Sequence, residues 1–198
     1  MLSGVGLHHL PRNNFARKVT QMDVKKIFTT RNQEISKNRV GLRQKIWPGV
    51  KDTQLWNRKQ QDGYTTMPRT MPLILSILDS LTPKGFPVAG VYLDLWCRVF
   101  DESFVVLNRP EDMAFTSGFT GQRRLQAWRK RLDLLQKLGF IKLAEGSNGK
   151  YSFALILNPH LVILSIRRKD ISRIPKNLFN VLAERAREVK AKDFMDGK

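Results

Sequence analysis

The chain has 198 residues, a length that fits one domain with extensions or two small domains and excludes a large multidomain enzyme. Its 35 Lys and Arg residues against 17 Asp and Glu give a formal net charge of +18, while 41% hydrophobic residues suffice for a core and exclude a chain disordered throughout. A basic excess of this size favours a polyanionic partner, of which DNA, RNA and anionic membrane surfaces are the usual candidates.

The sequence lacks the motifs of disulfide-bonded, metal-binding, membrane-spanning and common enzyme classes. Cys97 is the single cysteine, which excludes an intrachain disulfide and a CxxC zinc site and favours a reducing, intracellular compartment. The three histidines have no metal-binding spacing, so we expect no metal and no cofactor. No apolar run approaches the roughly 18 residues of a membrane span. Without a Walker sequence, GxSxG or a Cys–His pair, we expect a binding protein, with an enzyme of unrecognised motif as the alternative.

The charge is unevenly distributed. Residues 1–70 carry a net +10, residues 71–118 a net −3, and residues 119–198 a net +11. The acidic middle is also the most apolar part and is expected to form the core. In residues 1–66, isolated apolar residues alternate with basic and amide side chains. This pattern indicates a basic, partly ordered N-terminal arm with one short helix near Asp23 to Thr30.

The middle of the chain predicts two helices, a strand and a short helix. Apolar residues at helical intervals follow Pro72, and a second such pattern runs from Val88 to Phe100. Phe104 to Leu107 is a β-branched and aromatic run typical of a strand. Pro110, followed by Glu111 and Asp112, predicts a short helix to about Ser117.

A long helix and a β-hairpin follow. Thr120 is a candidate cap for a helix over 121–138, whose residues Leu125, Trp128, Leu132 and Leu135 lie on one face. Gly139 ends this helix. The segments 140–145 and 151–157 then predict two strands joined by a turn at 146–150.

This order of elements over residues 67–160 resembles the winged helix-turn-helix family. The resemblance is carried by Ala114 and Gly118, by Phe119 in the turn, and by the helix ending Leu134-Leu-Gln-Lys-Leu-Gly-Phe-Ile141 with the hairpin behind it. It implies a mainly α fold with a small β-hairpin, flanked by the arm over 1–66 and a helical C-terminal extension over 161–198. It further implies a sequence-specific double-stranded DNA-binding protein, either a bacterial transcriptional regulator or a plasmid or mobile-element replication or partition factor, in the cytoplasm with the nucleoid.

In this family the second helix of the pair enters the major groove, which makes helix 121–138 the expected recognition helix. Arg123 and Gln126 are the best candidates for base contacts, because Arg pairs with guanine and Gln with adenine. Phosphate contacts are expected from Arg124, Arg129, Lys130 and Arg131. Further DNA contacts are expected from Thr120 and Gln122, from the wing at 146–150, which would meet a flanking minor groove or the backbone, and from a basic cluster behind it. The wing residues are Asn148 and Lys150, and the cluster consists of Arg167, Arg168 and Lys169.

Other interpretations stay open. The basic helix face is also compatible with a solvated surface, and the wing with an ordinary turn. An RNA- or ribonucleoprotein-associated structural protein with basic arms is the alternative function, and a partition adaptor that oligomerises through 175–195 is a third. The amphipathic helix from about Pro175, with Leu178, Val181, Leu182 and Val189 on one side, predicts either a homodimer interface or packing on its own domain.

Overall fold

The computed structural model describes residues 33–147 and 149–197, and the chain divides into two compact units, Met1–Gln61 and Asp62–Lys198. The described part of the first unit contains a helix over 33–46 and the 3-10 turn η1 (Asp52–Gln54). The helix over 33–46 was not predicted from the sequence, because its few apolar residues, Ile35, Val40, Leu42 and Ile46, form no sustained helical pattern. The short helix expected near residues 23–30 lies outside the described residues.

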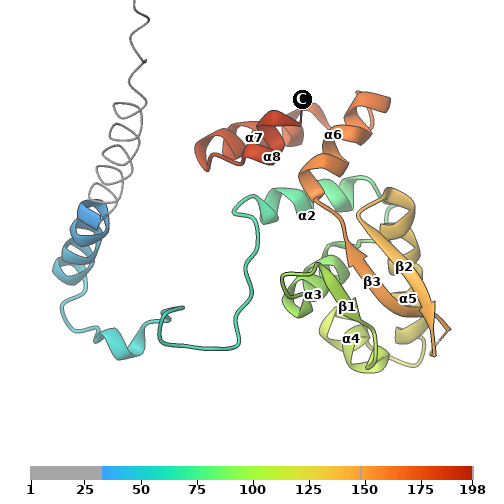
Figure 1. Ribbon diagram of the computed structural model, residues 1–198, viewed down its shortest axis with the longest axis horizontal. Helices are drawn as coiled ribbons and strands as arrows, with labels where there is room; N and C mark the ends of the chain where they lie inside the picture. The colour runs from blue at the N-terminus through green and yellow to red at the C-terminus, as the bar shows by residue number, and fades with distance from the viewer. Residues whose placement is uncertain (1–32, 148, 198) are drawn as a thin grey trace, which may run out of the picture. The chain divides into compact units, whose positions relative to one another are not determined.

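The second unit is mainly helical with a small antiparallel sheet (Figure 1). The sheet has three strands in the order β1-β3-β2, so the hairpin strand β3 lies between its partner β2 and the early strand β1. In chain order the elements of this unit are α2 (Met71–Ser80), α3 (Ala89–Arg98), β1 (Phe104–Val106), α4 (Pro110–Thr116), α5 (Arg124–Leu138), β2 (Ile141–Gly146), β3 (Gly149–Ile156), α6 (Pro159–Lys169), α7 (Lys176–Glu188) and α8 (Lys192–Asp196).

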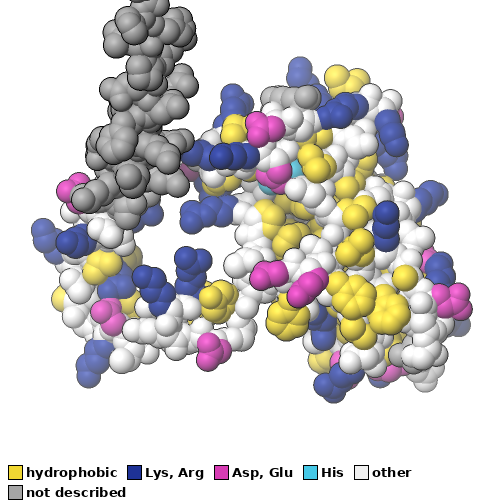
Figure 2. All heavy atoms as spheres, viewed as in Figure 1, with side chains coloured by type: hydrophobic (Ala, Val, Ile, Leu, Met, Phe, Trp, Pro, Cys, Tyr) yellow, Lys and Arg dark blue, Asp and Glu magenta, His cyan; other side chains and the backbone are white. Residues whose placement is uncertain are grey.

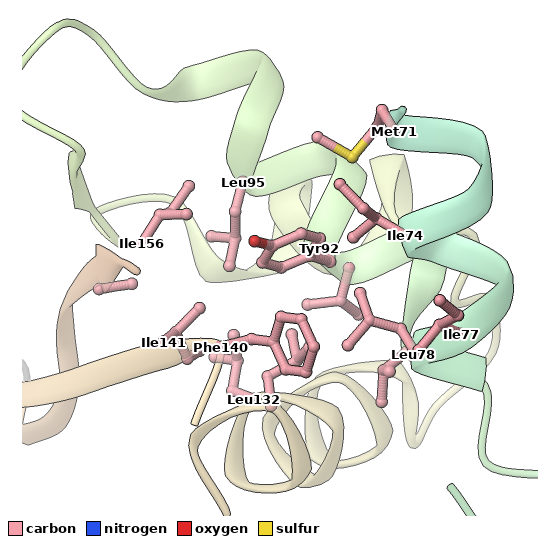
Figure 3. Close-up of a cluster of buried hydrophobic side chains, with 14 of the residues drawn as sticks. Met71, Ile74, Ile77, Leu78, Tyr92, Leu95, Leu132, Phe140, Ile141 and Ile156 are labelled. Atoms are coloured by element: carbon pink, nitrogen blue, oxygen red, sulfur yellow. The ribbon is translucent and has the colours of Figure 1, made fainter. Parts of the chain in front are cut away.

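One hydrophobic core joins these elements (Figure 3). Ile74 and Leu78 of α2 lie against Tyr92 of α3, whose ring meets the Phe140 ring edge to face at a centroid distance of 5.7 Å. Leu132 of α5 approaches the same centre from the other side. Because each helix contributes the apolar face that the sequence pattern predicted, the core explains why α2, α3 and α5 form where they do.

The second predicted helix ends earlier than expected. The pattern from Val88 extended to Phe100, whereas α3 stops at Arg98 and Val99 is extended (φ −79°, ψ 144°). A tight turn follows, in which the Ser103 amide donates to the Phe100 carbonyl and Ser103 itself has a left-handed φ of 58°. Phe100 is therefore 82% exposed instead of joining the buried face of α3.

The long helix α5 begins at Arg124, three residues later than predicted. Gly118 and Gly121 have φ values of 92° and 81°, and this left-handed backbone cannot continue into a helix. The N-cap position falls on Arg123, and no side chain caps the helix. Thr120 therefore lies in the turn between α4 and α5, and its predicted role as the cap is wrong.

The C-terminal helices pack back onto the same unit. Leu182 and Ala186 of α7 are buried, with α2 as a neighbouring element, whereas Val181 is 48% exposed and lies off the buried face. Of the two arrangements predicted for this helix, the structure shows packing on its own unit. Leu182 and Ala186 are therefore occupied by contacts within the unit.

Candidate nucleic-acid interface

The helices α4 and α5 and the turn between them form a packed pair. Met113 and Ala114 on α4 are buried, and the Phe119 amide donates to the Ala114 carbonyl at 3.0 Å, which folds the turn back onto α4. Phe119 is half-buried against the core. The turn therefore holds the N-terminal end of α5 in a fixed position relative to α4.

The N-terminal half of α5 exposes polar and basic side chains. Trp128, Leu132 and Leu135 are fully buried on one face of the helix. Steps of 100° per residue place Gln126 and Lys130 on the opposite face, and Arg123 precedes the first turn on the same side. Within the described residues, the side chains of Arg123, Gln126 and Lys130 make no hydrogen bond or ion pair, so their donors face solvent. Gln122, in the turn, is exposed as well.

Two arginines predicted for phosphate contacts have partners inside the protein. Arg124 donates through Nε to Glu111 of α4 at 2.8 Å, and both side chains are substantially exposed. The Arg129 guanidinium lies 5.4 Å from the centre of the Tyr151 ring, on β3. We call Arg123, Gln126 and Lys130 the exposed row. Arg124 and Arg129 flank this row and are not part of it.

Arg131 is the clearest departure from the predicted set. It is 8% exposed, and its guanidinium donates to the carbonyls of Gly85 at 3.1 Å and Pro87 at 3.3 Å. It also lies over the rings of Phe86, at 4.5 Å, and Phe119, at 5.4 Å. Burial lowers the pKa of Arg131 from its usual value. The side chain joins the α2–α3 loop to the turn before α5 and is not available to a phosphate.

The predicted β-hairpin is present, with its turn between β2 and β3. The strands pair from Ile141 with Ile156 to Gly146 with Gly149, which confirms the hairpin. At its tip Lys150 donates to Asp133 of α5 at 2.6 Å, and the same carboxylate accepts from the Tyr151 hydroxyl at 2.9 Å. Hydrogen bonding to Asp133 raises the pKa of Lys150. Asn148 lies outside the described residues.

The basic cluster behind the hairpin is mostly engaged in the packing of α6. Arg167 lies 4.0 Å from the centre of the Phe179 ring on α7, and Arg168 donates to the Gly197 carbonyl. Lys169 is exposed at the C-terminal end of α6. The structure therefore places Arg167 against α7, while Arg168 and Lys169 are exposed.

A second constellation has the connectivity of a hydrolase triad. Thr70 Oγ1 lies 2.7 Å from His160 Nε2, and His160 Nδ1 lies 2.8 Å from Asp193 Oδ2. Thr70 is fully buried and His160 is 2% exposed, so no substrate reaches the hydroxyl. The three residues link the start of α2, the start of α6 and α8. We therefore interpret them as a structural hydrogen-bond chain, which sequence reasoning missed because its members are far apart in the chain.

The described residues show no metal-binding cluster of three or more His, Cys, Asp or Glu side chains. Over the same residues, every helix is too short or too polar to cross a bilayer. Comparisons with protein-family models, curated proteins and solved structures found no match for this chain.

Proposed function

We propose that this protein binds double-stranded DNA sequence-specifically as a winged helix-turn-helix protein, without catalysing a reaction. A transcriptional regulator or a plasmid or mobile-element replication or partition factor would act in this way. The observation that carries the proposal is the exposed row of Arg123, Gln126 and Lys130, whose side chains have no partner within the described residues, on a helix whose other face is firmly buried.

The order of the elements supports this assignment. The segments α3, β1, α4, α5, β2 and β3 follow one another as the winged helix-turn-helix resemblance implies. Strand β1, between α3 and α4, completes a three-stranded sheet with the hairpin. The left-handed Gly118 and Gly121 place two sharp bends in the turn, which separates α4 from the helix that would enter the groove.

The chemistry of the row suits the major groove. A guanidinium donates to both N7 and O6 of guanine, and a carboxamide pairs with N6 and N7 of adenine, so Arg123 and Gln126 would read bases. Lys130 lies one helical turn further along and would contact a phosphate. Arg124 and Arg129 flank the row and would add phosphate contacts without losing their present neighbours, since both are partly exposed.

The hairpin would contact the DNA backbone beside the groove. Lys142 is exposed on β2, and Lys150 lies at the tip of the hairpin, paired with Asp133. An exposed ion pair of this kind contributes about 0–1 kcal/mol, so Lys150 can exchange Asp133 for a phosphate at small cost.

The test is selection of binding sequences from random DNA, followed by fluorescence-anisotropy titration of the selected duplex. Arg123→Ala and Gln126→Ala should each weaken binding by about 5- to 150-fold, the equivalent of one bidentate base contact, and relax the preference at one base pair. The matched controls are Arg187→Ala and Asn180→Ala, which change the same kinds of exposed side chain on α7 and should leave binding within about twofold.

The titration also separates this proposal from the RNA-associated alternative. Sequence-selective binding that survives about 0.15 M salt and a structured-RNA competitor supports the proposal. Selection that recovers no preferred sequence, or variants of Arg123 and Gln126 that bind like the wild type, would refute it. Preferential binding to the RNA competitor would favour the RNA-associated function instead.

A further inference from the structure

Strand β1 forms one edge of the sheet, and its outward backbone groups are unused by β3. Two backbone hydrogen bonds lie at the ends of its pairing with β3: the Ile156 amide donates to the Ser103 carbonyl, and the Leu107 amide donates to the Ser152 carbonyl. Because backbone groups in an antiparallel pair alternate in direction, Val105 also faces β3, while Phe104 and Val106 direct their amides and carbonyls away from it. An edge of this kind is a template for another strand.

The solvent-facing side of the sheet next to this edge is apolar. Phe104 pairs with Leu155 and Val106 with Phe153, and the Phe104 and Phe153 rings stack at a centroid distance of 5.5 Å. Phe104 and Val106 are 43% and 46% exposed. Figure 2 shows large hydrophobic side chains gathered over β1 and β3, with acidic side chains beside them. We call Phe104, Val106, Phe153 and Leu155 the sheet patch.

We propose that the β1 edge and the sheet patch form the interface of a homodimer, in which the β1 strands of two copies pair antiparallel about a two-fold axis through Val105. The proposal does not depend on DNA binding. It also uses a different surface from α7, whose Leu182 and Ala186 are buried within their own unit.

The register follows from the length of the strand. Only Phe104 and Val106 present outward backbone groups, so pairing Phe104 of one copy with Val106 of the other uses all of them and makes four hydrogen bonds. Every other two-fold register leaves part of the edge unpaired. In this register each pair joins an aromatic and a β-branched side chain on the apolar side of the sheet, a favourable cross-strand combination.

Charges at the two ends of β1 complement each other in the same register. Asp101 and Glu102 precede the strand, and Arg109 follows it; all three are exposed. Antiparallel pairing brings the acidic start of one strand next to the basic end of the other, twice about the axis. Arg109, 74% exposed, now pairs with Asp112, an interaction open to solvent and therefore weak. A strand with unlike charges at its two ends favours pairing with its own copy.

The proposal is tested by sedimentation velocity of the full chain without DNA, over a series of micromolar concentrations. The wild type should shift from monomer towards dimer as concentration rises. Val106→Lys should raise the dissociation constant at least about tenfold, because a charge on the edge disrupts strand addition. The control Val181→Lys makes the same change at an equally exposed valine on α7 and should dimerise like the wild type.

Two further variants test the backbone and the charges separately. Val106→Pro removes an outward amide that β3 does not use, so the monomer should keep its circular dichroism spectrum while the dimer is lost. Arg109→Asp and Asp101→Arg should each weaken the dimer, and the double variant should recover most of the loss. A wild type that stays monomeric, or a Val106→Lys variant that dimerises like Val181→Lys, would overturn the proposal.

Discussion

Arg131 offers a quantitative test of the fold around α5, because its guanidinium is buried without an acidic partner. We consider two substitutions. Arg131→Met keeps the aliphatic stem and removes the charge and the donors, whereas Arg131→Ala also removes the stem. The comparison separates the polar contacts to Gly85 and Pro87 from the packing of the stem between Phe86 and Phe119.

The magnitude follows from the contacts. Two hydrogen bonds to carbonyls stabilise the fold by about 1 kcal/mol each, and two cation–π contacts together contribute about 1 kcal/mol. Removing the guanidinium also abolishes its desolvation penalty, which offsets about half of this sum. We therefore expect a loss of about 1–2 kcal/mol in the free energy of unfolding for Arg131→Met. Arg131→Ala should lose about 1 kcal/mol more, because the stem no longer packs against the rings.

The assay is urea unfolding followed by circular dichroism and tryptophan fluorescence, with the slope m compared between variants. A double-mutant cycle with Phe86→Ala should give a coupling energy of about 0.5–1 kcal/mol. Under conditions where both proteins are folded, Arg131→Met should bind DNA like the wild type. Unfolding free energies within about 0.5 kcal/mol of wild type, combined with weakened DNA binding, would refute this account and make Arg131 a phosphate contact.

Two other predictions concern the turn before α5 and the hydrogen-bond chain of Thr70, His160 and Asp193. Gly121→Ala should lower the free energy of unfolding by about 1 kcal/mol in the same urea assay, because φ is 81° there, although no atom would contact the new methyl group; an unchanged midpoint would contradict the left-handed turn. Burial alone would raise the pKa of Asp193, but hydrogen bonds from Asn158 and His160 outweigh it and hold the pKa below its usual value. This carboxylate therefore stabilises the fold at neutral pH, and the contribution should fade as the pH falls below about 4. Asp193→Asn should flatten the acidic part of the curve of unfolding free energy against pH. A curve of unchanged shape would contradict a stabilising role for the Asp193 hydrogen bonds.

The elements from α2 to β3, and α7, could be predicted from the sequence because their signals are local, whereas α6 and α8 were not predicted individually. The helical spacing of Leu125, Trp128, Leu132 and Leu135 identified the buried face of α5 without knowledge of what covers it. The hairpin followed in the same way from two strand-like runs around a turn. The boundaries were less predictable, since backbone conformation at Gly121 and Val99 decided where α5 starts and α3 ends.

The sequence by itself determined the order of the helices and strands from α2 to β3, their apolar faces and the total positive charge. Only the tertiary structure decided which of those charges remain open to a partner. Arg123, Lys130 and Arg131 contribute the same charge to the basic segment, yet Arg131 meets carbonyls more than 40 residues earlier in the chain, while the other two face solvent. The exposed edge of β1 depends likewise on pairing with β3, about 50 residues away. Such contacts join distant segments, and local periodicity carries no information about them.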